Sequence, residues 1–216
     1  MTDAHAVATN PACKRLFSVH PAFHARIRAM VMNKGVEYGG DSIVDFTDGI
    51  VYPSTTQNGT FNSVDLQRGL VDWHTHPATC RKVNECTMGL PSPADLVNVL
   101  QGAALGTLCH LLYSREGTYV IQVTAPVRRA LVAAGGTSQS QSRTIMTEFT
   151  ALFKKFNSKQ TMSAVQYESL CHAYIARARR EGVYMKLFKG DTIPRFDMKY
   201  NCEFKTAGPG LSAVRK

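Results

Sequence analysis

Apolar side chains recur at intervals of three and four in several segments of the chain, which is the spacing that gathers them on one face of a helix. In the first segment, Phe23, Ile27 and Val31 form a single stripe, and Gly35 follows as a signal for the end of a helix. The pattern predicts helices over residues 21–33, 93–105, 145–156 and 163–181.

Shorter apolar runs that are bounded by turn residues predict β-strands. Asp48-Gly49 separates two such runs and indicates a hairpin, because an Asp-Gly pair readily adopts the turn that joins antiparallel strands. Residues 114–117 separate two further runs and indicate a second hairpin. The predicted strands cover residues 42–46, 50–52, 70–76, 108–113, 118–123 and 183–188.

Breaks in this pattern predict how the chain is divided. Residues 1–19 have no sustained period and are predicted to form a flexible arm. Residues 134–142 are rich in Gly, Ser and Gln, which is typical of a flexible connection. They separate a core over residues 20–133 from a helical part over residues 143–207, which either completes that core or is appended to it. Residues 208–216 are predicted to be a disordered tail.

The charge is distributed unevenly along the chain. The chain has a net charge of +9, yet residues 1–125 carry 9 Lys and Arg against 10 Asp and Glu, whereas residues 126–216 carry 16 against 6. A basic run on a helix is most often a solvated polar face, as at residues 177–180. The alternative is a surface for an anionic partner, such as nucleic acid, an acidic protein or an anionic lipid surface.

Composition narrows the class of protein. The 216 residues are 44% hydrophobic and include no apolar run of 18 residues, and the N-terminus lacks the order of a signal peptide. We therefore expect no membrane span and an intracellular location, cytoplasmic or nuclear. The six cysteines are too few and too irregularly spaced for a disulfide scaffold, so buried or free thiols are expected.

The candidate chemistry begins at His74-Thr75-His76-Pro77, which ends the predicted strand over residues 70–76. Side chains alternate between the two faces of a strand, so His74 and His76 are expected on one face and Trp73 on the other. One face would then pack into a core while the other presents two imidazoles.

Ser92-Pro93-Ala94-Asp95 has two interpretations. Ser at the N-cap, Pro at the first helical position and an acid at the third approximate a capping box, which predicts only the start of a helix. If that helix begins beside the strand, Asp95 completes a zinc site with His74 and His76. Two histidines and one carboxylate leave the fourth position open for water, as in catalytic zinc sites.

Glu37, the His-x-His-Pro run and the Ser-x-x-Asp run occur in the order found in the JAMM (MPN-plus) zinc metalloproteases, and the chain resembles that family over roughly residues 20–125. The resemblance implies that His74, His76 and Asp95 bind zinc. It also implies that Glu37 is the base that activates the water, and that Ser92 donates a hydrogen bond to the oxyanion. Without the downstream ligands, Glu37 would be interpreted as an ordinary exposed carboxylate.

The same resemblance implies a fold and an activity. The expected fold is α/β, with a mixed, largely antiparallel sheet flanked by helices in MPN/JAB-like, cytidine-deaminase-like layering. The expected activity is hydrolysis of an isopeptide bond, with conjugates of ubiquitin or a ubiquitin-like protein as partners. The alternatives are a JAMM-type peptidase on other substrates and a binding module without activity, although such modules typically lose ligands.

Three stretches depart from this pattern or stay open. Residues 78–91 form a longer insertion than is usual in the family; they resemble variants of large DNA viruses, which would locate the protein in a host cell or virion. Cys80 and Cys86 within them are a weak signal for a second zinc site. Residues 53–63 are either a flap over the substrate or a solvated connection. His110, on an apolar strand, is interpreted as a core residue and left out of the site.

Overall fold

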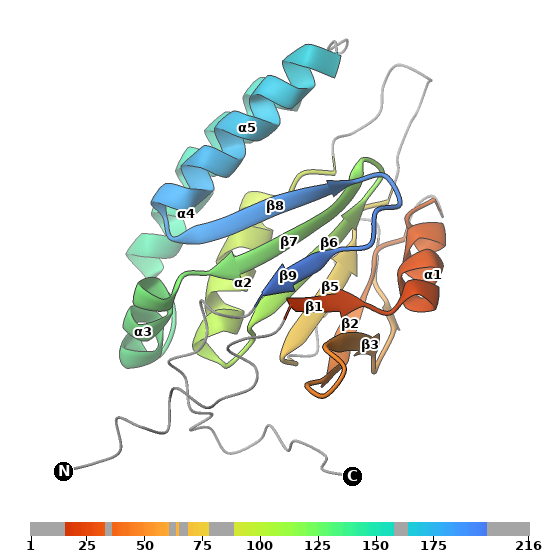
Figure 1. The fold of residues 1–216 in the computed structure, drawn as a ribbon. Coiled ribbons are helices and arrows are strands. Elements are labelled where there is room, and N and C mark those ends of the chain that lie inside the picture. Colours follow the sequence, from red (N-terminus) through yellow and green to blue (C-terminus); the bar gives the residue numbers. More distant parts are fainter. Residues whose placement is uncertain are drawn as a thin grey trace, which may run out of the picture.

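The computed structural model of the protein describes residues 16–32, 36–60, 64, 69–77, 89–157 and 164–197. Within these ranges the chain forms an α/β fold in which five helices flank one mixed sheet of nine strands (Figure 1). This agrees with the predicted class of a mixed, largely antiparallel sheet between helices. The helices and strands predicted from the sequence are present, with ends that differ by a few residues.

The sheet has the strand order β8-β7-β6-β5-β2-β3-β1-β9, and β4 pairs with β2 beside this path. The pairs β1–β3 and β5–β6 are parallel, and the other pairs are antiparallel. The strands are β1 (Leu16–Val19), β2 (Tyr38–Asp45), β3 (Ile50–Pro53), β4 (Gln57–Asn58), β5 (Val71–Thr75), β6 (Cys109–Ser114), β7 (Gly117–Val123), β8 (Val183–Lys189) and β9 (Arg195–Asp197).

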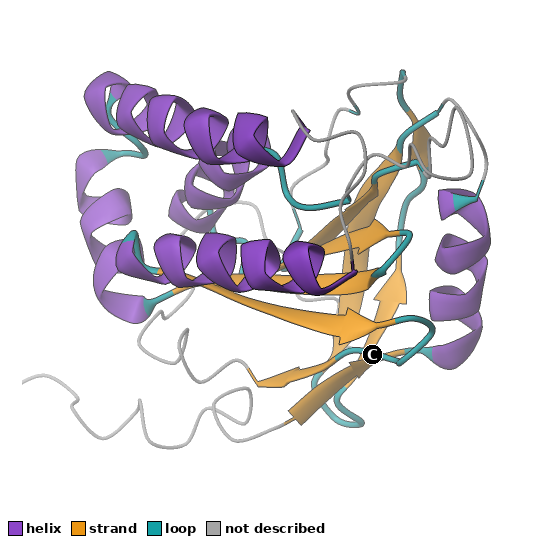
Figure 2. Ribbon diagram, turned by 90° about the horizontal axis from the view of Figure 1, so that it is seen from above, coloured by secondary structure: helices purple, strands orange, loops and turns teal. Residues whose placement is uncertain are grey.

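The sheet is strongly curled. The side-chain nitrogen of Gln122 in β7 donates to the backbone oxygen of Asp197 in β9 at 2.9 Å, although five strands lie between β7 and β9 in the sheet order. The concave face holds an apolar core in which Phe17, Trp73 and Phe196 are buried, and the helix α1 (Pro21–Val31) packs its own apolar stripe into this core. Figure 2 shows α1 on the opposite side of the sheet from the other helices.

The convex face is covered by four helices, which share a second apolar core with β6, β7 and β8. They are α2 (Pro93–Ala104), α3 (Ala125–Ala134), α4 (Gln139–Asn157) and α5 (Ala164–Arg180). Leu100 of α2, Phe149 of α4 and Tyr174 of α5 are buried in this core. Since β8 also pairs with β7 along its whole length, the C-terminal part completes the core of the fold.

Two boundaries drawn from the sequence need correction. Residues 16–19, assigned above to a flexible arm, form β1 with Phe17 and Val19 fully buried; four residues are too few to establish a period. The stretch 134–142, assigned to a flexible connection, contains the start of α4 at Gln139. The hydroxyl of Ser138 accepts from the backbone nitrogen of Gln141 at 3.1 Å, so a Ser-rich run serves here as the cap of a helix.

Some basic side chains of residues 126–216, where the positive charge is concentrated, make contacts within the fold. Arg128 is 1% exposed and donates to the backbone oxygens of Ala103 and Thr107. Arg177 pairs with Glu148 and Glu181. Part of the positive charge therefore supports the structure, and the anionic partner stays a prediction. None of the helices in the described part of the chain combines the length and the apolar character that a membrane crossing requires.

Candidate metal centre

His74 lies in β5, a strand in the middle of the sheet between β2 and β6. The alternation of side chains along β5 is the one expected: Val71 and Trp73 enter the concave core, whereas Asp72 and His74 belong to the convex face. His74 is only 3% exposed. A rigid, buried strand therefore holds this imidazole.

His76 follows the end of β5 and is held by the neighbouring strand. Its backbone nitrogen donates to the backbone oxygen of Tyr113 in β6 at 2.8 Å, which continues the pairing of the two strands past Thr75. Its side chain is 16% exposed. The imidazoles of His74 and His76 lie on one face, as predicted, with their Nε2 atoms 3.2 Å apart.

Asp95 reaches the histidines from the first turn of α2. Ser92 is the N-cap of this helix: its hydroxyl accepts from the backbone nitrogen of Asp95 at 3.1 Å, and Asp95 Oδ2 accepts from the backbone nitrogen of Ser92 at 2.6 Å. This is the predicted capping box. The two interpretations of the sequence are therefore compatible, because the cap that starts the helix also fixes the carboxylate beside the imidazoles.

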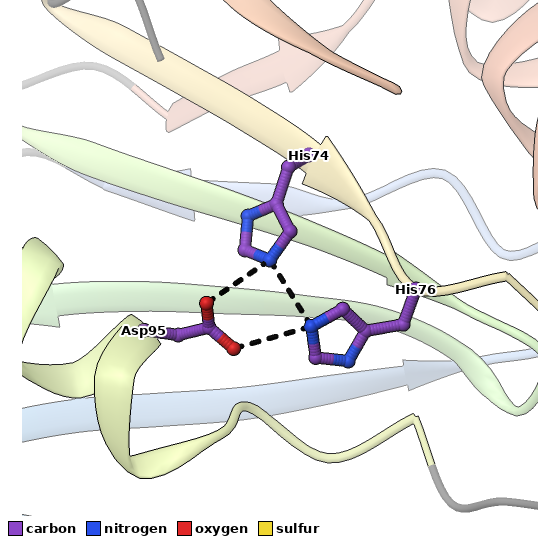
Figure 3. A group of neighbouring side chains, drawn as sticks. All are labelled: His74, His76 and Asp95. Carbon is purple, nitrogen blue, oxygen red and sulfur yellow. Dashed lines mark hydrogen bonds and ion pairs between the residues drawn. The ribbon is translucent and has the colours of Figure 1, made fainter. Parts of the chain in front are cut away.

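His74, His76 and Asp95 form a compact group of potential metal ligands (Figure 3). His74 Nε2 lies 3.3 Å from Asp95 Oδ1, and His76 Nε2 lies 3.1 Å from Asp95 Oδ2. Ligand atoms about 2.0–2.2 Å from a tetrahedral zinc ion are about 3.3–3.6 Å apart. The three spacings of 3.1–3.3 Å lie at or just below the short end of this range, so they are close to the edges of such a site, and two nitrogens with one oxygen suit zinc.

The protonation states of two of the three ligands suit metal binding, which requires neutral imidazole and ionised carboxylate. Burial lowers the pKa of His74 to about 4, although Asp95 opposes this change. Burial would raise the pKa of Asp95, but the adjacent histidines hold it well below its ordinary value. Burial also disfavours the charged form of His76, yet Asp95, Glu37 and Glu116 together raise its pKa. A proton therefore competes with the metal chiefly at His76.

Glu37 is anchored beside this group at the start of β2. Its backbone nitrogen donates to Thr60 and its backbone oxygen accepts from Gly59, both at 2.8 Å. Gly39 pairs with His74 in the antiparallel β2–β5 ladder, and continuing that register by two positions brings Glu37 alongside His76. The side chain is only 9% exposed.

The pKa of the Glu37 carboxyl reflects this location. Burial raises it to about 7, and the negative charge of Asp95 adds to the rise while His76 opposes it. A carboxyl with a pKa near 7 can accept a proton at neutral pH and release it again. Ser92 is half-buried at the same helix start, and its hydroxyl still has a hydrogen to donate after accepting from Asp95.

The C-terminal part of the chain holds the start of α2 in place. The hydroxyl of Tyr174 in α5 donates to the backbone oxygen of Pro91 at 2.5 Å, directly before Ser92. Burial raises the pKa of Tyr174 above its usual range, and the charge of Asp95 adds to the rise. The helix α5 thus helps to position the carboxylate of the metal group.

Two residues that sequence reasoning did not place in the site are linked to it, His110 directly and Asp72 through His110. His110 Nε2 lies 2.7 Å from His74 Nδ1, and His110 Nδ1 lies 2.5 Å from Asp72 Oδ1. His110 is a buried residue of the sheet, as predicted, and is not one of the three grouped ligands. The sequence contained a signal for this arrangement. Asp72 is an acid within an apolar strand, on the same face as His74, and the neighbouring strand β6 contains His110.

Some predictions fall on residues outside the described part. They include most of the insertion over residues 78–91, with Cys80 and Cys86, and the tail over residues 208–216. The described cysteines, Cys109 and Cys171, are buried free thiols. Within residues 53–63, Gln57 and Asn58 form β4, which pairs with Tyr38 and Gly39 next to Glu37.

Comparisons with protein-family models, with curated proteins and with solved structures gave no match to this chain. The resemblance to the JAMM metalloproteases therefore rests on the five residues Glu37, His74, His76, Ser92 and Asp95 and on their arrangement.

Proposed function

We propose that the protein is a zinc-dependent hydrolase of amide bonds, with an MPN/JAB-like fold and with His74, His76 and Asp95 as the zinc ligands. The observation that carries the proposal is the spacing of their ligand atoms, 3.1–3.3 Å, in a group assembled from β5, the residue after it and the start of α2. A capping box explains why Asp95 lies near Ser92, but it does not require two imidazoles to converge on the same carboxylate.

Zinc, when bound, supplies a Lewis acid that lowers the pKa of water toward about 7. Glu37 accepts the proton of the attacking water and returns it to the leaving amine, a role that suits a carboxyl whose pKa is raised to about 7. Ser92 donates its hydroxyl hydrogen to the oxyanion that develops on the substrate carbonyl. These roles are the ones that the resemblance implies.

Within this class we propose an isopeptidase that acts on ubiquitin or a ubiquitin-like protein. Support comes from the resemblance and from the location of β4, which pairs with β2 immediately beside Glu37. Similar family members hold an extended substrate tail at this point, and an added strand is bound mainly through its backbone. Peptidase activity on other substrates would use the same chemistry.

The test is release of ubiquitin from a panel of isopeptide-linked dimers, measured beside a linear ubiquitin fusion and a chelator-treated sample. Cleavage of at least one isopeptide-linked dimer, abolished by the chelator, is the expected result. Cleavage of the linear fusion alone would favour the general peptidase. If no substrate is cleaved although zinc is bound, the assignment to ubiquitin fails.

Glu37→Gln tests the mechanism, because glutamine keeps the size of the side chain and removes the group that accepts the proton. General-base catalysis is worth about 10²- to 10⁴-fold, so kcat should fall by that order while zinc is retained. Glu168→Gln is the matched control, since this exposed glutamate of α5 pairs with Lys189 and lies outside the metal group. A Glu37→Gln variant that is as fast as wild type contradicts the proposed role.

A further inference from the structure

The site contains a buried arrangement that the proposed function does not use. Asp72 and His110 are direct partners in the parallel ladder between β5 and β6, and His74 follows Asp72 by two positions on the same face. The three residues are between 1% and 3% exposed. Polar groups this deeply buried normally have hydrogen-bond partners, because an unpaired buried polar group costs free energy.

The contacts join these side chains into a chain that ends at the metal group. Asp72 Oδ1 lies 2.5 Å from His110 Nδ1, and His110 Nε2 lies 2.7 Å from His74 Nδ1. The remaining ring nitrogen, His74 Nε2, faces Asp95 and His76 (Figure 3). Every ring nitrogen of His74 and His110 therefore faces a polar atom of a neighbouring side chain.

With an ionised Asp72 and a neutral His110, these hydrogen bonds determine where every proton in this chain lies. Asp72, when ionised, only accepts, so the proton between it and His110 belongs to His110 Nδ1. The Nε2 atom of a neutral His110 then carries a lone pair and accepts from His74 Nδ1. His74 is thereby held as the tautomer with its proton on Nδ1, which leaves the lone pair of Nε2 directed at the metal group.

We propose that Asp72 and His110 are positioning residues that fix the tautomer and ring orientation of His74 for metal binding. This inference rests on the zinc site of the proposed function. It extends that site through a second histidine to a carboxylate of the same strand that bears His74. Partners of this kind typically contribute 10- to 100-fold to metal affinity, because the ligand need not reorient or exchange its proton before it binds.

The main experiment measures the zinc dissociation constant by competition with a chromophoric chelator. His110→Phe removes both hydrogen bonds and should weaken zinc binding 10- to 100-fold. His110→Gln should restore much of the affinity, because its amide oxygen can accept from His74 while its amide nitrogen donates to Asp72. Asp72→Asn keeps the volume but no longer dictates one tautomer, so an intermediate loss is expected.

His24→Phe is the matched control. His24 is also 3% exposed, but it lies in α1 on the concave side of the sheet, with Nε2 3.2 Å from the backbone oxygen of Asp191. The same substitution there should perturb the stability of the metal-free protein without changing its zinc affinity. A purely structural role for His110 predicts equal effects of His110→Phe and His24→Phe on zinc binding, and that result would overturn the proposal.

Nitrogen-15 NMR of the imidazoles provides a second readout, which remains decisive if His110→Phe does not fold. In zinc-loaded wild type, His74 and His110 should both carry their proton on Nδ1; a proton found on His110 Nε2 would overturn the proposal. The two levels of inference fail differently. If wild type binds no zinc, the proposed function and the positioning role fail together; if it binds zinc and His110→Phe binds equally well, only the positioning role fails.

Discussion

Trp73 and His74 are neighbours in β5 and are buried to nearly the same extent, but their burial has different consequences for the protein. Trp73 is fully buried in the apolar core of the concave face, where its ring meets Phe23 of α1 edge-on at 5.7 Å between centroids. Removing such a side chain from water stabilises the folded chain. His74, 3% exposed on the other face, instead contacts the polar side chains of His76, Asp95 and His110.

Burial of His74 disfavours its protonated form, which lowers its pKa to about 4 and keeps the ring neutral at physiological pH. A neutral imidazole has a lone pair for a metal. The same degree of burial thus stabilises the fold on the concave face and prepares a ligand on the convex face. Alternation along one strand separates the two roles by a single residue.

The largest effect that tests this comparison is on the concave side. Trp73→Ala should lower the free energy of unfolding by about 3–5 kcal/mol, because it removes a large ring from a closed core and leaves a cavity. At about 2–4 °C per kcal/mol for a chain of this size, Tm should fall by about 6–20 °C. Ile43→Ala, at a position of β2 that is 61% exposed, is the control and should change stability by less than about 0.5 kcal/mol.

On the convex face, loss of a metal ligand should lower the free energy of unfolding by a similar amount, but only when zinc is present. Zinc at about a thousand times its Kd should stabilise wild type by about 4 kcal/mol. His76→Ala removes a half-buried ligand and should abolish this gain while leaving the metal-free Tm nearly unchanged. Calorimetry with and without a chelator measures both quantities.

Elemental analysis should give one zinc per chain. Two per chain would point to a second site at Cys80 and Cys86, and none in active protein would contradict the metal centre.

The sequence predicted the elements that have a clear period and the ligands that have a recognisable spacing. The helix that delivers Asp95 and the strand that bears His74 were found because each is a strong local pattern. The strand β9 and the two-residue β4 were not predicted, since their pairing is determined by distant parts of the chain.

The helix α3 was also missed, although its sequence carried signals for it. Pro126 lies in its first turn, and Gly135, with φ of 73°, ends it in the left-handed conformation.

The contacts of His110 with Asp72 and His74 were missed for a different reason, because they join two strands. His110 was interpreted correctly as a buried strand residue, but its partners depend on the register of β5 against β6, and that register is not visible in either strand alone.

A smaller effect on the free energy of unfolding is expected at Glu37, where burial of the ionised side chain destabilises the folded protein. Its pKa is raised from 4.5 to about 7, so the folded protein holds this proton more tightly than the unfolded chain does. The resulting stabilisation is complete below about pH 4.5 and is lost as the pH rises through about 7. Above pH 7 the ionised carboxylate is buried at a cost on the order of 3 kcal/mol.

Glu37→Gln does not titrate, so its stability relative to wild type, both without metal, should be higher at pH 8 than at pH 5 by about that amount. Urea unfolding at the two pH values measures the difference, and the histidines, which are common to both proteins, largely cancel. An equal difference at both pH values would show that the environment of Glu37 does not raise its pKa.

The smallest effect concerns the outer surface of the convex side, where charge contributes little to stability. Arg177 of α5 pairs with Glu148 of α4 and with Glu181, and its guanidinium lies over the ring of Phe149 at 5.6 Å. Its side chain is 18% exposed, so solvent screens the pairs only in part. Arg177→Ala should lower the free energy of unfolding by up to about 1 kcal/mol, and 1 M salt should reduce that loss.

A double-mutant cycle with Glu148→Ala isolates the ion pair from the contact with Phe149. The same cycle on Lys189 and Glu168, whose side chains are 74% and 54% exposed, should give a coupling energy near zero. A coupling of 3 kcal/mol or more at Arg177, comparable to the loss expected for Trp73→Ala, would mean that charge holds the helical layer as strongly as the apolar core does, and the contrast between the two sides of the sheet would then be wrong.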